Sequence, residues 1–199
     1  MIWVGDQAHI LRDSDGHALK IIGYMFDITE RKQDQEKLDL AAKVFTRSHD
    51  GIIVTDKNRK ILHVNEAFTQ ITGYTPEEAV GKDPRILQSG KQGPEFYKTL
   101  WTQLEKQGYW HGEMLNKRKD GGVYTESLTI STIQDVKGEV INYVGIFSDI
   151  SDVKKYQLQL KRVAHYDLLT QLPNRLLLCD CLKKGMSQSL RRGVSMAVV

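Results

Sequence analysis

Asn116 is the residue of this sequence whose side chain is the strongest candidate for hydrogen bonding to a ligand. It lies in the stretch 109–122, which is predicted to be a strand that ends in a tight turn at Asp120-Gly121-Gly122. Side chains alternate along a strand, so Asn116 shares one side with Trp110 and Met114. The other side would carry His111, Glu113 and Leu115. A buried amide needs partners for its two donors and its carbonyl, and either the protein or a ligand must supply them.

Composition excludes several functional classes. The chain has 199 residues and a formal charge of +3, and its basic residues are interleaved with acids, so nothing indicates nucleic-acid binding. No apolar run approaches the ~18 residues of a membrane span, and we expect no secretory signal. Cys179 and Cys181 have no second pair to complete a zinc site, so we expect reduced thiols in a cytoplasmic protein.

The order of predicted elements indicates an α+β domain with one sheet. Two short strands are followed by several short helices and then by three antiparallel strands, and the helices must cover one face of the sheet. Asn65 is suited to cap the helix 66–72, which Gly73 would end. Besides the strand and turn at 109–122, the expected elements are strands at 51–56, 60–64, 123–133 and 140–149, a short helix from Thr75-Pro76, an irregular stretch at 81–93, and helices at 30–47, 94–107 and 150–164.

The chain also contains a partial repeat at an offset of 122 residues. The stretch 15–38 aligns without gaps to 137–160, so that Gly23 falls on Gly145 and Asp27 on Asp149. We therefore expect residues 1–29 to be the end of a domain whose second copy is complete downstream.

Several motifs in the same order resemble the PAS sensory domain with its C-terminal PAC half. They are Asp50–Asp56 (DGIIVTD), Val64–Phe68 (VNEAF), Ile71–Tyr74 (ITGY), Trp110–Glu113 (WHGE), Asn116–Gly121 (NKRKDG) and Asp149–Asp152 (DISD). The resemblance implies a PAS fold, that is, a five-stranded antiparallel sheet with short helices on one face that enclose a small pocket. It implies these divisions: 1–29, the C-terminal part of a preceding PAS/PAC domain; 30–48, a connecting helix; 49–150, the PAS/PAC domain; and 151–164, a signalling helix.

The stretch 165–175 (HYDLLTQLPNR) is similar to the entry of a GGDEF, or diguanylate cyclase, domain, although Gln171 departs from the usual glycine. We therefore expect residues 165–199 to be the N-terminal part of a GGDEF domain, with an apolar strand at 194–199. The catalytic loop of that family would follow Val199, so this chain is expected not to be an enzyme. The resemblance implies that a longer parent is a bacterial diguanylate cyclase, with or without a following EAL phosphodiesterase.

Three cofactor classes of the PAS family can be compared with the sequence. Pro84 occupies the position of the reactive cysteine of light-sensing LOV domains, so we expect no flavin–thiol adduct. Haem-binding members use a histidine on or beside the long helix, and 94–107 contains none, so haem is not expected.

The third class, the FAD-binding redox sensors of the nitrogen-fixation regulatory type, resembles this chain from Gly81 to Asp120 without a gap. By this resemblance Trp101 and Asn116 contact the flavin ring, and Leu87, Trp110 and Met114 are further cofactor-binding candidates. Pro84 again departs, because that family has a glutamate there. An alternative remains open, in which Trp101 is a core residue and Asn116 bonds to backbone in a pocket that is empty or holds another small ligand.

The sequence therefore favours a signalling module. Residues 49–150 would sense a small ligand, or a redox state through bound FAD. The change would pass through Asp149, Ile150 and Ser151 to the following helix, and from there to a cyclic-di-GMP output domain. The alternative is a cofactor-free dimerisation spacer. The expected partners are a second copy of the chain, joined through the PAS domain and helical linkers, and a small molecule or flavin, with no nucleic acid, metal or membrane contact.

Overall fold

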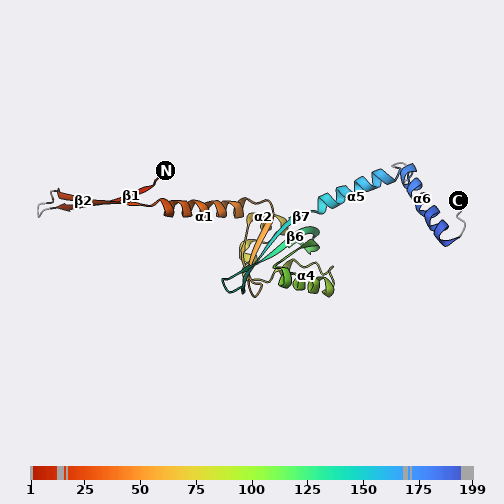
Figure 1. The fold of residues 1–199 in the computed structure, drawn as a ribbon, viewed down its shortest axis with the longest axis horizontal. Coiled ribbons are helices and arrows are strands. Elements are labelled where there is room, and N and C mark those ends of the chain that lie inside the picture. The colour runs from red at the N-terminus through yellow and green to blue at the C-terminus, as the bar shows by residue number, and fades with distance from the viewer. Residues whose placement is uncertain (1, 13–15, 17, 168–169, 171, 194–199) are drawn as a thin grey trace.

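The structure, a computed structural model, describes residues 2–12, 16, 18–167, 170 and 172–193. A five-stranded antiparallel sheet forms its centre, with the strands in the order β4-β3-β7-β6-β5 (Figure 1). Those strands are β3 (Gly51–Asp56), β4 (Ile61–Val64), β5 (Tyr109–Lys117), β6 (Val123–Gln134) and β7 (Val140–Asp149). The predicted α+β fold is confirmed, and the strands predicted at 51–56, 60–64, 123–133 and 140–149 have bounds that are correct to within one residue.

Four short helical elements lie between β4 and β5. They are α2 (Glu66–Thr72), α3 (Pro76–Ala79), the 3₁₀ helix η1 (Pro84–Leu87) and α4 (Pro94–Gln107). The sequence predicted an irregular stretch where η1 lies. That helix begins because Asp83 accepts a hydrogen bond from the Arg85 amide and Pro84 already has a helical φ.

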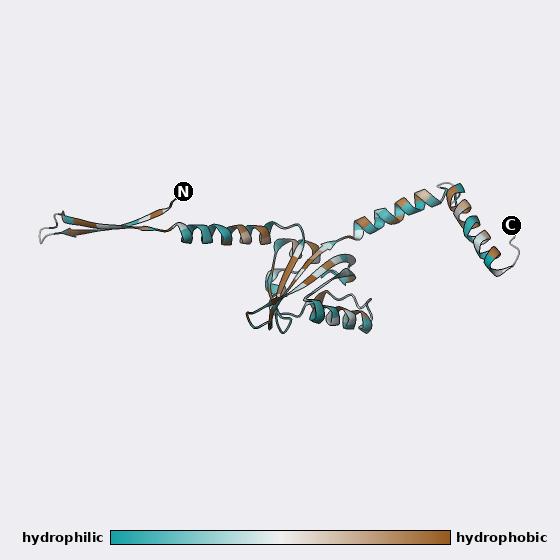
Figure 2. Ribbon diagram, in the orientation of Figure 1, coloured by the Kyte–Doolittle hydropathy of each residue, from teal (hydrophilic) through white to brown (hydrophobic). Residues whose placement is uncertain are grey.

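The hydrophobic core lies between one face of the sheet and these helices. Buried residues alternate along β5 and β6, with Trp110, Met114 and Asn116 inside, as predicted. The remaining buried apolar residues of this core are Ile53, Ile61, Phe68, Ala79, Leu87, Leu100, Leu104, Leu128 and Phe147. Figure 2 shows hydrophobic residues along the strands of this sheet, whereas α1 (Thr29–Arg47) is largely hydrophilic.

Asn65 links three parts of the domain through one buried side chain. Its Oδ1 accepts hydrogen bonds from the amides of Phe68 at 3.0 Å and Ile52 at 2.8 Å. Its Nδ2 donates to the carbonyls of Phe45 at 3.1 Å and Asp50 at 2.9 Å. The predicted cap of α2 is therefore confirmed, and the same amide also fixes the end of α1 against β3.

The N-terminal segment reproduces the geometry of β6 and β7. Strands β1 (Val4–Arg12) and β2 (Ala18–Asp27) form an antiparallel hairpin in which Val4 pairs with Asp27, just as Glu126 pairs with Asp149. In both hairpins the register shifts just before the last pair at the turn, between Leu11 and Arg12 in β1 and between Ile133 and Gln134 in β6. The repeat in sequence is thus also a repeat in strand register, although β1 has 9 residues and β6 has 12.

Helices leave the domain at both ends (Figure 1). α1 precedes it, and α5 (Ser151–His165) follows β7 and leads to α6 (Arg175–Arg192). Neither α1 nor α5 has a buried residue. Of the helices in the described ranges, none is long and apolar enough to cross a membrane. The strand predicted at 194–199 lies outside the described residues.

Candidate functional site: a cavity and a helix junction

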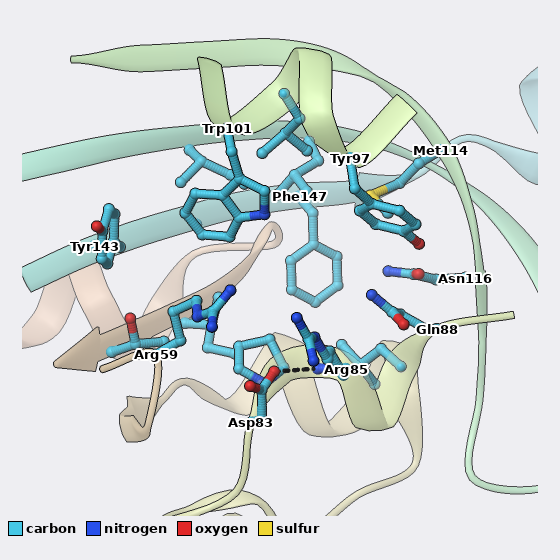
Figure 3. A pocket seen from close by; sticks show the side chains of 18 of the residues that line it. Arg59, Asp83, Arg85, Gln88, Tyr97, Trp101, Met114, Asn116, Tyr143 and Phe147 are labelled. Atoms are coloured by element: carbon cyan, nitrogen blue, oxygen red, sulfur yellow. Dashed lines mark hydrogen bonds between the residues drawn. The ribbon is translucent and has the colours of Figure 1, made fainter. Parts of the chain in front are cut away.

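A cavity of about 460 Å³ lies inside the domain, between the core face of the sheet and the elements η1 and α4 (Figure 3). This volume is within the range of small-molecule and cofactor sites. Its apolar wall is formed mainly by Ile53, Leu87, Leu100, Met114, Leu128, Ile130 and Phe147. Gly145 also lines it, and its missing side chain leaves room for Ile53 of β3, since a Cβ there would lie 2.8 Å from that side chain.

Asn116 and Glu126 form the polar end of the cavity. They are adjacent because β5 pairs with β6 in a register that places Met114 opposite Glu126 and Asn116 opposite Tyr124. Asn116 Nδ2 donates to Glu126 Oε1 at 2.8 Å, and the two residues are 5% and 1% exposed. Asn116 Oδ1 and Glu126 Oε2 have no hydrogen-bond partner among the described residues. The described residues thus supply one partner for the predicted buried amide and none for its carbonyl.

Burial changes the acidity of two groups at this end. Burial raises the pKa of Glu126 to about 7, and the polar neighbours Tyr124 and Asn116 oppose the shift only in part. Burial, together with the charge of Glu126, also raises the pKa of Tyr97, whose hydroxyl has no partner among the described residues. Glu126 can therefore hold a proton near neutral pH, and the hydroxyl of Tyr97 stays protonated.

Aromatic rings and cations line the opposite part of the cavity wall. Trp101 of α4 meets Tyr143 of β7 edge to face, with ring centroids 5.7 Å apart. The Arg59 guanidinium lies 5.2 Å from the Trp101 ring centroid, and Figure 3 shows both side chains beside the cavity. Arg85 and Lys98 are exposed residues of the same wall. These three cations can pair with an anionic group of a ligand whose ring system lies deeper.

Four of the five predicted cofactor-binding residues line the cavity, namely Leu87, Trp101, Met114 and Asn116. The fifth, Trp110, does not. Its indole lies over Gly112, where a Cβ would come within 2.5 Å of the ring, and it meets Phe96 edge to face at 5.8 Å. Trp110 is therefore a core residue beneath α4, because the glycine two residues along the strand leaves room for the ring there.

The sequence analysis missed Glu126 and the cavity cations. A signal for Glu126 was present, because it lies between Tyr124 and Leu128 in the alternation that places both inside. Arg59 and Arg85 gave no such signal, since they lie in a turn and in a 3₁₀ helix that only the fold brings to one wall. Of the described residues, no group of histidine, cysteine, aspartate or glutamate could hold a metal ion.

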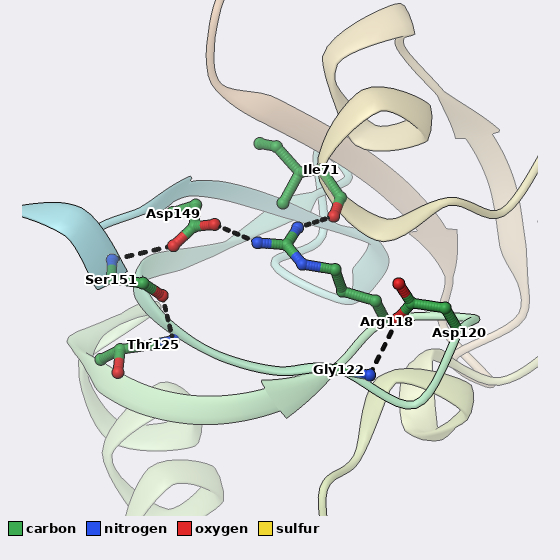
Figure 4. A network of polar contacts seen from close by, with 7 residues as sticks. All are labelled: Ile71, Arg118, Asp120, Gly122, Thr125, Asp149 and Ser151. Atoms are coloured by element: carbon green, nitrogen blue, oxygen red, sulfur yellow. Dashed lines mark hydrogen bonds and ion pairs between the residues drawn. The ribbon is translucent and has the colours of Figure 1, made fainter.

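The junction between β7 and α5 is a second polar site (Figure 4). Asp149 Oδ1 accepts a hydrogen bond from the Ser151 amide at 2.8 Å, and Asp149 Oδ2 pairs with Arg118. Arg118 also donates to the Ile71 carbonyl, and its guanidinium lies 4.5 Å from the Tyr124 ring centroid. Arg118 therefore connects α2, β6 and the start of α5.

The predicted relay residues all lie at this junction, in different roles. Asp149 satisfies the first amide of α5, whereas the Ser151 hydroxyl accepts from the Thr125 amide at 2.9 Å and so attaches α5 to β6. Ile150 occupies the cap position without a side-chain hydrogen bond. Burial raises the pKa of Asp149, but the hydrogen bonds from Ser151 and Arg118 lower it by more, so its net pKa is below the ordinary value.

The end of β2 and the start of α1 form the same kind of junction. Asp27 accepts from the Thr29 amide at 2.8 Å, as Asp149 does from Ser151. Thr29 Oγ1 accepts from the Trp3 amide at 2.9 Å, as Ser151 does from Thr125. The two strand-to-helix junctions therefore have the same pattern of hydrogen bonds, made by residues whose numbers differ by 122.

Comparison with known proteins agrees with this geometry. A nitrogen fixation regulatory protein of Klebsiella oxytoca is 30% identical over 126 residues, which is 63% of this chain and 25% of that protein. The structure of a PAS domain from a Colwellia psychrerythraea protein is 27% identical, with a TM-score of 0.56, covering 58% of this chain and 98% of that one. A Light-Oxygen-Voltage domain studied with a flavin analogue is also 27% identical, with a TM-score of 0.52, over 62% of this chain and 93% of its own.

This chain spans about a quarter of the length of the nitrogen fixation regulator, so the two correspond only in part. The sequence profile of the PAS domain matches residues 49–152, which is more than half of the chain and contains the whole five-stranded sheet. The cavity, the sheet order and the strand-to-helix junction all lie within these bounds. The chain belongs to the PAS domain family.

Proposed function

We propose that residues 49–150 are a sensory domain that holds a flavin, FAD being the form expected by resemblance, and that the domain signals through α5. The observation that carries this proposal is the carbonyl of Asn116, which is buried, belongs to a residue that lines a cavity of cofactor size, and has no donor in the described part of the chain. The Light-Oxygen-Voltage relative, whose study used a flavin analogue, supports a flavin over other ligands.

The residues present fit such a group. Asn116 and Glu126 would hold the polar edge of the ring, and Leu128 and Phe147 would contact its faces. Trp101 would supply aromatic contact, while Arg59 and Arg85 would pair with phosphate. When bound, a flavin supplies redox and light-absorbing chemistry.

The domain can signal only if its ligand favours one of two arrangements of the junction. Tyr124 gives a physical connection, because it pairs with Asn116 in the sheet and stacks under the guanidinium of Arg118. Arg118 in turn pairs with Asp149 at the start of α5. A shift of Asn116 towards a ligand would therefore be transmitted to the junction.

The remaining parts of the proposal concern the longer protein. The register of β1–β2 and its junction support an additional PAS copy before residue 30. The stretch 165–175 supports a diguanylate cyclase output after α5 in a cytoplasmic, dimeric bacterial protein. A cofactor-free PAS dimerisation spacer is the second candidate, and the half-exposed apolar face of α5, with Val153, Tyr156, Leu160 and Val163, favours it.

The visible absorption spectrum tests the flavin directly. We expect bands at about 450 and 370 nm in the purified protein or after incubation with FAD and removal of excess. Asn116→Leu and Trp101→Leu should lower the bound fraction at least tenfold, whereas His111→Ala, on the outward face of the same strand, should not change it. A featureless spectrum for the wild type after incubation would contradict the proposal and favour the spacer.

A further inference from the structure

Glu126 is an ionisable residue at the polar end of the cavity that no motif predicted. It is 1% exposed, it lines the cavity, and its Oε1 is occupied by Asn116 Nδ2. The hydrogen bond from Asn116 fixes the orientation of both groups. Within this pair, it leaves Asn116 Oδ1 and Glu126 Oε2 without a partner among the described residues.

The proton on Glu126 decides which ligand edge these two atoms accept. If Glu126 is ionised, the pair presents two acceptors and matches a ligand edge with two N–H donors, such as an amidine or an amino-substituted ring. If Glu126 carries a proton on Oε2, the pair presents one acceptor and one donor. That pattern matches an N–H next to a carbonyl, as in a cyclic imide or lactam.

We infer that Glu126 is the specificity-determining residue of the cavity, binding in its protonated form to the imide edge of a flavin-type ring, so that ligand binding takes up one proton. In this arrangement Glu126 Oε2–H donates to a ring carbonyl, and the adjacent ring N–H donates to Asn116 Oδ1. The inference rests on the proposed function and adds the residue and protonation state that select the ligand.

The surroundings of Glu126 favour the neutral form. Met114 lies opposite on β5 and Leu128 is two residues along β6, so the carboxyl has apolar neighbours. Asp149 lies opposite on β7, and its negative charge disfavours a second carboxylate. The cation Arg118 is already paired with Asp149. The other titratable groups facing this end are Tyr97 of α4 and Tyr124 of β6. The Tyr124 hydroxyl favours the ionised form of Glu126, but burial favours the neutral form by more.

The pH dependence of affinity follows with a definite sign. Burial raises the pKa of Glu126 to about 7 in the free protein, so below that pH the binding-competent form predominates. Above it, each pH unit should lower the apparent affinity about tenfold, because a proton must first be bound. Between about pH 6 and pH 8.5 the dissociation constant should therefore rise roughly 30-fold.

Glu126→Gln separates this effect from other consequences of pH. A glutamine keeps an oxygen to accept from Asn116 Nδ2 and supplies a permanent N–H donor in place of the carboxyl proton. We expect this variant to bind FAD at both pH values with the affinity that the wild type has only at the lower one. Glu113→Gln removes the same charge from the outward face of the sheet and should keep the full pH dependence.

The experiment is a fluorescence-quenching titration of FAD into the full chain at about pH 6 and pH 8.5, with proton uptake measured by calorimetry in two buffers of different ionisation enthalpy. Uptake of a proton above neutral pH in the wild type, and none in Glu126→Gln, would support the inference. FAD binding with equal affinity at both pH values, or more tightly at the higher one, would overturn it while leaving the proposed function intact. No FAD binding by either protein at any pH would overturn both.

Discussion

The ion pair between Arg118 and Asp149 offers the sharpest test of the junction between β7 and α5. The two side chains are 29% and 25% exposed, so solvent screens the pair only in part. A hydrogen bond to a charged group contributes about 1.5–3 kcal/mol, and an exposed ion pair less than about 1 kcal/mol. We therefore expect a coupling free energy of about 1.5 kcal/mol between the two residues.

A double-mutant cycle isolates this energy. Asp149→Asn keeps an oxygen for the Ser151 amide and removes only the charge, while Arg118→Met keeps apolar contact with Tyr124. The free energies of unfolding of wild type, both single variants and the double variant would come from urea titrations followed by the fluorescence of Trp101 and Trp110. A coupling of this size corresponds to a midpoint shift of roughly 1 M urea.

Acid should abolish the coupling. The pKa of Asp149 is lowered in the folded state, so the contribution is present above the ordinary value of 3.8 and is lost as the pH falls through the lower folded pKa. A coupling below about 0.5 kcal/mol at neutral pH would refute the assignment of Arg118 as the connection between the domain and α5. Asp149→Ala removes the contact to Ser151 as well, so it should melt lower than Asp149→Asn and should not be used to measure signalling alone.

Three further outcomes are expected from other parts of the domain. Asn65→Ala should lower the free energy of unfolding by about 3 kcal/mol, because it deletes a helix cap and leaves buried groups of three segments without partners. Thermal melting measures this loss. A loss below about 1 kcal/mol would be inconsistent with the four hydrogen bonds. Gly112→Ala should cost about 2 kcal/mol in the same assay, since its Cβ would lie 2.5 Å from Trp110, and a neutral result would mean that the indole can move elsewhere. Burial raises the pKa of Glu126 from 4.5 to about 7, so its stabilising contribution is complete below 4.5 and disappears as the pH rises through 7. In urea titrations Glu126→Gln should therefore be more stable than wild type by about 3 kcal/mol above pH 8 and equal to it near pH 4.5, and equal stability at both pH values would show that the carboxylate is solvated.

Local patterns in the sequence were sufficient for the individual elements. The alternation around Asn116 gave the buried face of β5, because side chains on a strand have a period of two residues whatever the strand pairs with. The cap at Asn65 and the helix end at Gly73 followed from single-residue preferences. The repeat at an offset of 122 residues likewise needed no structure, and its two halves share strand register.

The tertiary structure decided what those elements form together. β3 pairs with β7, almost ninety residues later, because burying both apolar strands in one sheet requires their contact, and no local pattern encodes that choice. The register of β5 with β6 places Glu126 beside Asn116, and the folded loops bring Arg59 and Arg85 to the same cavity wall. Trp110 lay on the predicted face but outside the cavity, since the space over Gly112 determines where its ring packs. The sequence by itself determined which side chains point inward, whereas the distances between them, and hence the site, depended on strand register and chain reversal.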